Sequence, residues 1–149
     1  MDSRPETYKH IFQVQHWIYK CVSNLIQRGH VHDASKLVSP ELEIFNKHTP
    51  KLAKCEYGSD EYKESLEAIK PALEHHYAKN THHPEHYVNG IDDMSLLDIL
   101  EMLCDWKSAS ERNKNGNILK SLDHNKERYN IDNQLYKILL NTINELDMK

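Results

Sequence analysis

The spacing of apolar residues is the feature that most restricts how this chain can fold. Five apolar residues near the N-terminus follow one another at steps of three and four: Ile11, Val14, Ile18, Val22 and Leu25. This period places them on one face of a helix, and no segment alternates apolar and polar side chains as a half-buried strand does. The 149 residues include only four Gly and five Pro, which are too few for a turn-rich β fold. We therefore expect an all-α protein.

Start and stop signals divide the chain into about five to seven expected helices. The helix starts are expected near Ser3, Asp33, Ser39, Ser59 or Asp60, Ser95, Leu119 and Asp132. Ser3 with Glu6 is typical of a capping box, and Gly29 is expected to end the first helix. Thr49-Pro50 should end the helix that begins at Ser39, and Pro71 should kink or split the next one. Residues 80–93 are expected to be irregular, and residues 1–149 to form one domain.

Composition excludes several classes of protein. No apolar run approaches the roughly 20 residues that span a bilayer, and the first residues lack the apolar stretch of a secretion signal. Three widely separated cysteines, expected to be reduced and mostly in the core, suit a reducing compartment, so we expect a cytoplasmic protein. The net charge is −4 and no block of Lys or Arg occurs, so we expect no dedicated nucleic-acid surface.

Histidine and aspartate stand out as candidate metal ligands. Five of the eleven histidines fall within twelve residues: His75, His76, His82, His83 and His86. An adjacent His-Asp pair lies further upstream and Lys36 follows it by three residues. Imidazole nitrogens and carboxylate oxygens together suit a borderline or hard divalent ion. The candidate ligands are His10, His32, Asp33, His75, His76 and Asp105.

The order of these residues resembles the HD superfamily of metal-dependent phosphohydrolases. That superfamily carries a His, then a His-Asp pair, then often one or two further His, then an Asp. The segment from His32 to Lys36 is similar to the family's His-Asp-x-Gly-Lys, with Ser35 in place of Gly. Over roughly residues 8–146 the chain also resembles small uncharacterised phage and bacterial proteins within or near this superfamily. The resemblance implies a single-domain, HD-like helical bundle with a central metal pocket.

Several assignments stay open on sequence alone. His16 competes with His10 for the first ligand position, and the spacing to the His-Asp pair favours His10. His48 could supply a ligand to a second ion or interact with a helix C-terminus. Asp98 and Glu101 share a helix face with Asp105 and are either partners of the ligands or part of a solvated acidic stripe.

The expected activity is metal-dependent hydrolysis of a small phosphate ester, such as a nucleotide, by a phosphomonoesterase or phosphodiesterase. One or two divalent ions (Mn, Ni, Co, Zn or Fe) would be bound. Asp33 would anchor the metal, Lys36 would balance developing negative charge, and His82 or His83 would deliver a proton. The alternatives are a diiron HD-like oxygenase and a non-catalytic module that binds a metal or a nucleotide. A homo-oligomer is possible, and no membrane partner is expected.

Overall fold

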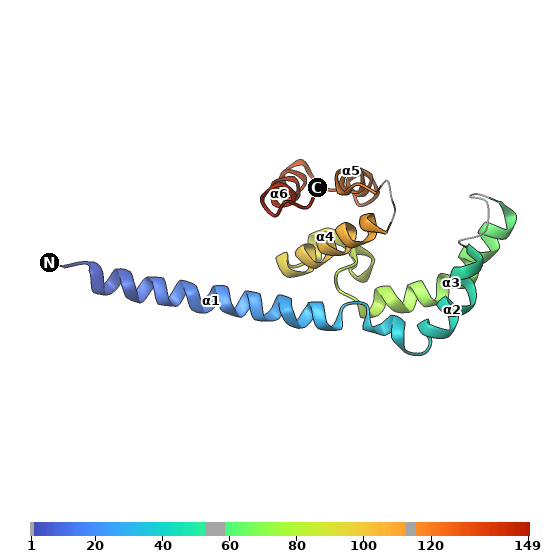
Figure 1. Ribbon diagram of the computed structural model, residues 1–149, viewed down its shortest axis with the longest axis horizontal. Coiled ribbons are helices and arrows are strands. Elements are labelled where there is room, and N and C mark those ends of the chain that lie inside the picture. The colour runs from blue at the N-terminus through green and yellow to red at the C-terminus, as the bar shows by residue number, and fades with distance from the viewer. Residues whose placement is uncertain (1, 53–58, 113–115) are drawn as a thin grey trace. The chain divides into compact units, whose positions relative to one another are not determined.

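The computed structural model describes residues 2–52, 59–112 and 116–149, and in these ranges it contains α-helices and short 3-10 helices but no strand (Figure 1). The expected all-α class is confirmed, and the six α-helices of these ranges agree with the expected number. Two compact units divide the chain, Met1–His32 and Asp33–Lys149, and each is described by itself. The single-domain expectation stays a prediction.

The first unit is one long helix, α1 (Arg4–Val31). It has Pro5 in its first turn, where the missing N–H costs nothing. The expected capping box is wrong, because the side chain of Ser3 makes no capping hydrogen bond. The expected stop at Gly29 is also wrong, since this glycine has no positive φ and the helix continues to Val31. No residue of α1 is buried, because its apolar stripe has no other element of its own unit to pack against.

The second unit begins with a 3-10 helix, η1 (Ala34–Leu37), and two α-helices that pack against each other, α2 (Glu41–Leu52) and α3 (Asp60–Lys79). The expected end of α2 at Thr49 is wrong. Pro50 lies inside α2, where it removes a single hydrogen bond, and the helix is described as far as Leu52. The expected start of α3 is confirmed at Asp60, and the helix is not split at Pro71. The sequence also predicts a loop over residues 51–60, and most of it lies outside the described residues.

Short 3-10 helices replace regular structure between α3 and α4, as the sequence predicts for residues 80–93. They are η2 (Pro84–His86) and η3 (Gly90–Asp93). Gly90 has a φ of 60°, a left-handed conformation that costs glycine little. This segment connects the helical pair α2–α3 to the rest of the unit.

The remaining helices, α4 (Leu96–Glu111), α5 (Ile118–Arg128) and α6 (Asn133–Glu145), enclose the main core. Each begins with a side-chain cap: Ser95 in a capping box with Asp98, then Asn117, then Asp132. The buried core residues are Leu103, Ile118, Leu122, Ile131, Leu139 and Ile143. This core supports α4, which supplies part of the site described below.

Two further expectations can be compared with the structure. None of the described helices combines the length and the apolar character needed to cross a membrane. The expectation of mostly buried cysteines is wrong for Cys21 and Cys104, which are exposed thiols. On α4 the neighbouring Leu103 occupies the buried position, so Cys104 lies on a different face of the helix. Cys55 lies outside the described residues.

Candidate metal centre

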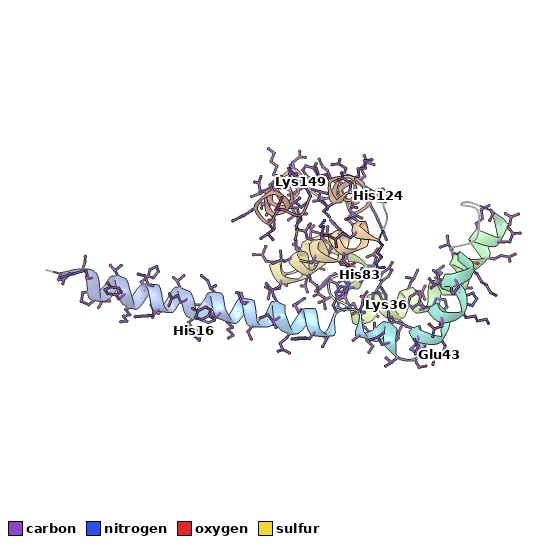
Figure 2. The ribbon with its side chains drawn as sticks, in the orientation of Figure 1. His16, Lys36, Glu43, His83, His124 and Lys149 are labelled. Atoms are coloured by element: carbon purple, nitrogen blue, oxygen red, sulfur yellow. The ribbon has the colours of Figure 1, made fainter. Side chains whose placement is uncertain are left out.

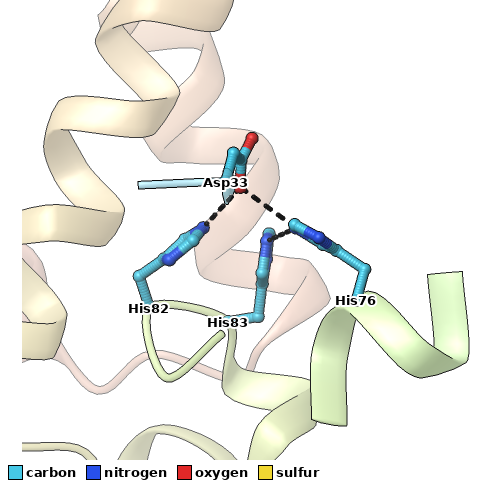
Figure 3. A group of neighbouring side chains, drawn as sticks. All are labelled: Asp33, His76, His82 and His83. Carbon is cyan, nitrogen blue, oxygen red and sulfur yellow. Dashed lines mark hydrogen bonds and ion pairs between the residues drawn. The ribbon is translucent and has the colours of Figure 1, made fainter. Parts of the chain in front are cut away.

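Four side chains of the second unit bring their ligand atoms together: Asp33, His76, His82 and His83. One nitrogen or oxygen of each lies within 4.8 Å of the others, so the group could hold a metal ion (Figure 3). Asp33 precedes η1, His76 lies near the end of α3, and the two adjacent histidines follow in the irregular segment. The site therefore joins segments that are more than forty residues apart in the chain.

Asp33 is the shared partner of the group. Its Oδ1 atom lies 3.1 Å from Nε2 of His76 and 3.4 Å from Nε2 of His82, while its Oδ2 atom accepts a hydrogen bond of 2.7 Å from Lys36. Burial alone would raise the pKa of Asp33, but these interactions outweigh it and hold the pKa far below its ordinary value. Asp33 is thus a carboxylate with one oxygen directed at the histidines.

The backbone at Asp33 has an unusual conformation. Its φ of 56° and ψ of 14° are left-handed, which is uncommon outside glycine but tolerated by Asp and Asn. This turn separates α1 from η1 and directs the carboxylate toward α3. Left-handed residues of this kind occur often at functional sites.

His76 is held in place by a buried carboxylate. Only 1% of its surface is exposed, and its Nδ1 atom lies 2.9 Å from Oε2 of Glu41, which is fully buried. Burial by itself would raise the pKa of Glu41, yet hydrogen bonds from His75, Ser35 and His76 lower it. The opposite ring nitrogen, Nε2, lies 3.1 Å from Oδ1 of Asp33 and 3.0 Å from Nε2 of His83. A proton on Nδ1, donated to Glu41, would leave Nε2 a lone pair for a metal ion.

His82 has a similar arrangement of partners. It is 2% exposed, and its Nδ1 atom lies 3.2 Å from Oε1 of Glu101 on α4. His83 completes the group with its Nε2 atom 3.0 Å from Nε2 of His76. Burial, reinforced by the neighbouring His82 and His76, lowers the pKa of His83 to about 3, so its imidazole is neutral near neutral pH. A neutral imidazole is the form that binds metals.

The separations within the group fit a transition-metal ion. Metal bonds of about 2.0–2.2 Å to nitrogen and oxygen keep neighbouring ligands about 3.0–3.5 Å apart in tetrahedral or octahedral geometry. The separations of 3.0 Å between His83 and His76, 3.1 Å between His76 and Asp33, and 3.4 Å between His82 and Asp33 fall in this range. Three imidazoles and one carboxylate favour a borderline ion over Mg²⁺ or Ca²⁺, which prefer oxygen ligands. The residues present therefore fit the expected cofactor.

Some of the candidate residues predicted from the sequence lie in or beside the four-residue group, and others do not. Asp33 and His76 belong to the group, Lys36 binds Asp33, and a carboxylate oxygen of Asp105 lies within 4.8 Å of a nitrogen of His82. His75 is not in the group, because its Nδ1 atom binds Oε1 of Glu41 at 2.7 Å. Residues of the first unit, His10, His16 and His32, keep their proposed roles as predictions.

Asp98 and Glu101, whose roles the sequence leaves open, have different partners in the structure. Asp98 caps α4 and accepts a hydrogen bond of 3.0 Å from the hydroxyl of Tyr87. Glu101 is a partner of His82. His48 lies on α2 and is outside the four-residue group.

Three polar residues around the site are missing from the sequence-based prediction. Glu41 has no assigned role in that prediction, although three side chains contact its carboxylate. Asn80 donates to Ser35 at 2.8 Å, and the hydroxyl of Ser35 donates to Glu41 at 3.1 Å. The only sequence signal for this contact is that Ser35 and Glu41 lie six residues apart. This spacing becomes informative only when the packing of α2 against α3 is known.

Comparison with known proteins gives a family without an assigned activity. The chain matches the model of a family of unknown function, DUF5662, over residues 1–145, and it belongs to that family. No curated protein and no solved structure matches it. The function must therefore be argued from the geometry of the site.

Proposed function

We propose that this protein is a metal-dependent phosphohydrolase related to the HD superfamily, acting on a small phosphate ester such as a nucleotide. The observation that carries the proposal is the group of Asp33 with His76, His82 and His83, with Lys36 on the second oxygen of the Asp33 carboxylate. A metal ion with an adjacent ammonium group suits phosphate, because both carry positive charge and attract the negatively charged oxygens of a phosphate ester.

The proposed roles follow from these contacts. Asp33, His76, His82 and His83 would hold one divalent ion (Mn, Ni, Co, Zn or Fe), and Asp105 lies close enough to His82 to contribute. A bound divalent ion polarises a phosphoryl oxygen and lowers the pKa of a coordinated water. His82 and His83 act here as ligands instead of proton donors, because their nitrogens point into the group.

Lys36 is the residue that links the site to phosphate. Its side chain is 39% exposed, so its ammonium group can reach a bound substrate while it contacts Asp33. Near a metal site it would balance the charge that develops on the phosphoryl oxygens.

The test is release of phosphate from a panel of nucleotides and simple phosphate esters, measured with each of the five metals added to metal-free protein. We expect metal-dependent hydrolysis, and a drop in kcat of at least roughly 10-fold in Lys36→Met with metal binding retained. Lys47→Met on the exposed surface of α2 is the matched control and should keep full activity. Absence of phosphate release with every metal, or oxygen consumption by a coloured iron-loaded protein, would contradict the proposal.

A further inference from the structure

Two carboxylates, one fully buried and one mostly buried, occupy equivalent positions beside the four-residue group of Asp33, His76, His82 and His83. Glu41 on α2 faces Nδ1 of His76, and Glu101 on α4 faces Nδ1 of His82. In both rings the opposite atom, Nε2, points at Oδ1 of Asp33. Two separate helices thus each supply a carboxylate that contacts one histidine, and both histidines face the same carboxylate oxygen of Asp33.

We propose that Glu41 and Glu101 are positioning residues, which fix His76 and His82 with a proton on Nδ1 and present Nε2 to the metal. This inference rests on the proposed metal centre and assigns the residues that orient its ligands. A carboxylate that accepts from one ring nitrogen fixes the tautomer and makes the other nitrogen a stronger ligand.

Burial argues that Glu41 has this specific role. Its side chain is 0% exposed, and a buried charge without partners is costly, yet three donors surround it. His75 donates to Oε1 at 2.7 Å, whereas His76 and Ser35 bind Oε2 at 2.9 and 3.1 Å. Asn80 in turn donates to Ser35 at 2.8 Å, so the hydroxyl group that binds Glu41 is itself fixed by a hydrogen bond.

The same network gives His75 a function. Its ring is 33% exposed and its Nδ1 atom is used by Glu41, so it fixes the carboxylate from the side opposite His76. The adjacent histidines of α3 therefore have different roles. His76 belongs to the four-residue group, and His75 binds Glu41, the residue that orients His76.

Glu101 contributes from the other side of the group. Its side chain is 12% exposed and belongs to α4, which the main core supports through Leu103. Because α4 is anchored in this way, Glu101 can hold His82, which lies in an irregular segment and has no helix of its own.

The test titrates metal-free protein with Co²⁺ and follows the visible absorption of the bound ion. We expect Glu41→Gln and Glu101→Gln to bind Co²⁺ about 10- to 100-fold more weakly than wild type, with a changed spectrum. The matched controls are Glu43→Gln on α2 (Figure 2) and Glu111→Gln on α4, both exposed, which should bind as wild type does. Unchanged affinity in both site variants would overturn the inference.

A second readout uses the unaltered protein, so it does not depend on how the variants fold. In Zn²⁺-loaded protein with ¹⁵N-labelled histidine, the rings of His76 and His82 should keep a proton on Nδ1 and bind through Nε2. Ligation through Nδ1 would overturn the assignment even if metal binds. If wild type takes up neither Co²⁺ nor Zn²⁺, the proposed metal centre itself fails, and this result differs from the other two.

Discussion

At the scale of single residues, adjacent histidines in this chain have different surroundings. His76 is 1% exposed and belongs to the four-residue group that could hold a metal ion, whereas the side chain of its neighbour His75 is 33% exposed and binds Glu41. Sequence identifies both as candidates, because a His pair near a His-Asp pair is an uncommon combination. It cannot rank them, since consecutive helical residues differ by about 100° in direction and only the packing partner decides which one points inward.

Histidines of the same segment should also differ in the effect of their removal. His82→Ala should lose metal binding by at least about 10-fold, because it removes a ligand. His86→Ala should keep full metal content and lower the free energy of unfolding by about 1 kcal/mol, since His86 donates one hydrogen bond of 2.9 Å to the carbonyl of Tyr77. Metal analysis and urea unfolding measure the two effects. Equal metal loss in both variants would contradict the assignment of His82 as a ligand.

At the scale of elements, helix starts are the best predicted features. The caps at Ser95 and Asp132 appear in the structure as the sequence predicts, because capping depends on a few neighbouring residues. Helix ends are predicted less well. α1 continues past Gly29 and α2 past Pro50, since these residues weaken a helix by amounts that neighbouring interactions can offset.

The cap of α6 offers a direct test at this scale. Oδ1 of Asp132 accepts a hydrogen bond of 2.7 Å from the backbone of Leu135. Asp132→Ala should lower the free energy of unfolding by about 1 kcal/mol, because one backbone donor of the first turn loses its partner. Gln134→Ala, an exposed change in the same turn, should alter it by less than about 0.5 kcal/mol. Denaturant unfolding of both variants provides the comparison, and equal stabilities would show that the cap contributes nothing.

At the scale of the whole molecule, the site depends on contacts between distant segments. The second unit joins Asp33, the end of α3, the irregular segment and α4 around one group of ligand atoms. The sequence predicts the fold class and several of these residues, but it misses Glu41 because its role appears only when α2 packs against α3. Residues that act on one another through tertiary packing leave no local pattern.

Metal content of the purified protein tests the central claim most directly. Protein purified without a chelating affinity step should contain about one transition-metal ion per chain, held by its histidines and Asp33. Asp33→Asn is the informative variant, because Asn also tolerates the left-handed backbone at this position and should retain the helical circular dichroism of wild type.

We expect Asp33→Asn to retain less than about a tenth of the metal, because the variant loses the charged carboxylate that lies between His76 and His82. Asp60→Asn, at the exposed start of α3, should retain all of it. A wild-type protein without stoichiometric metal after incubation with each candidate ion, or equal metal content in wild type and Asp33→Asn, would contradict the account.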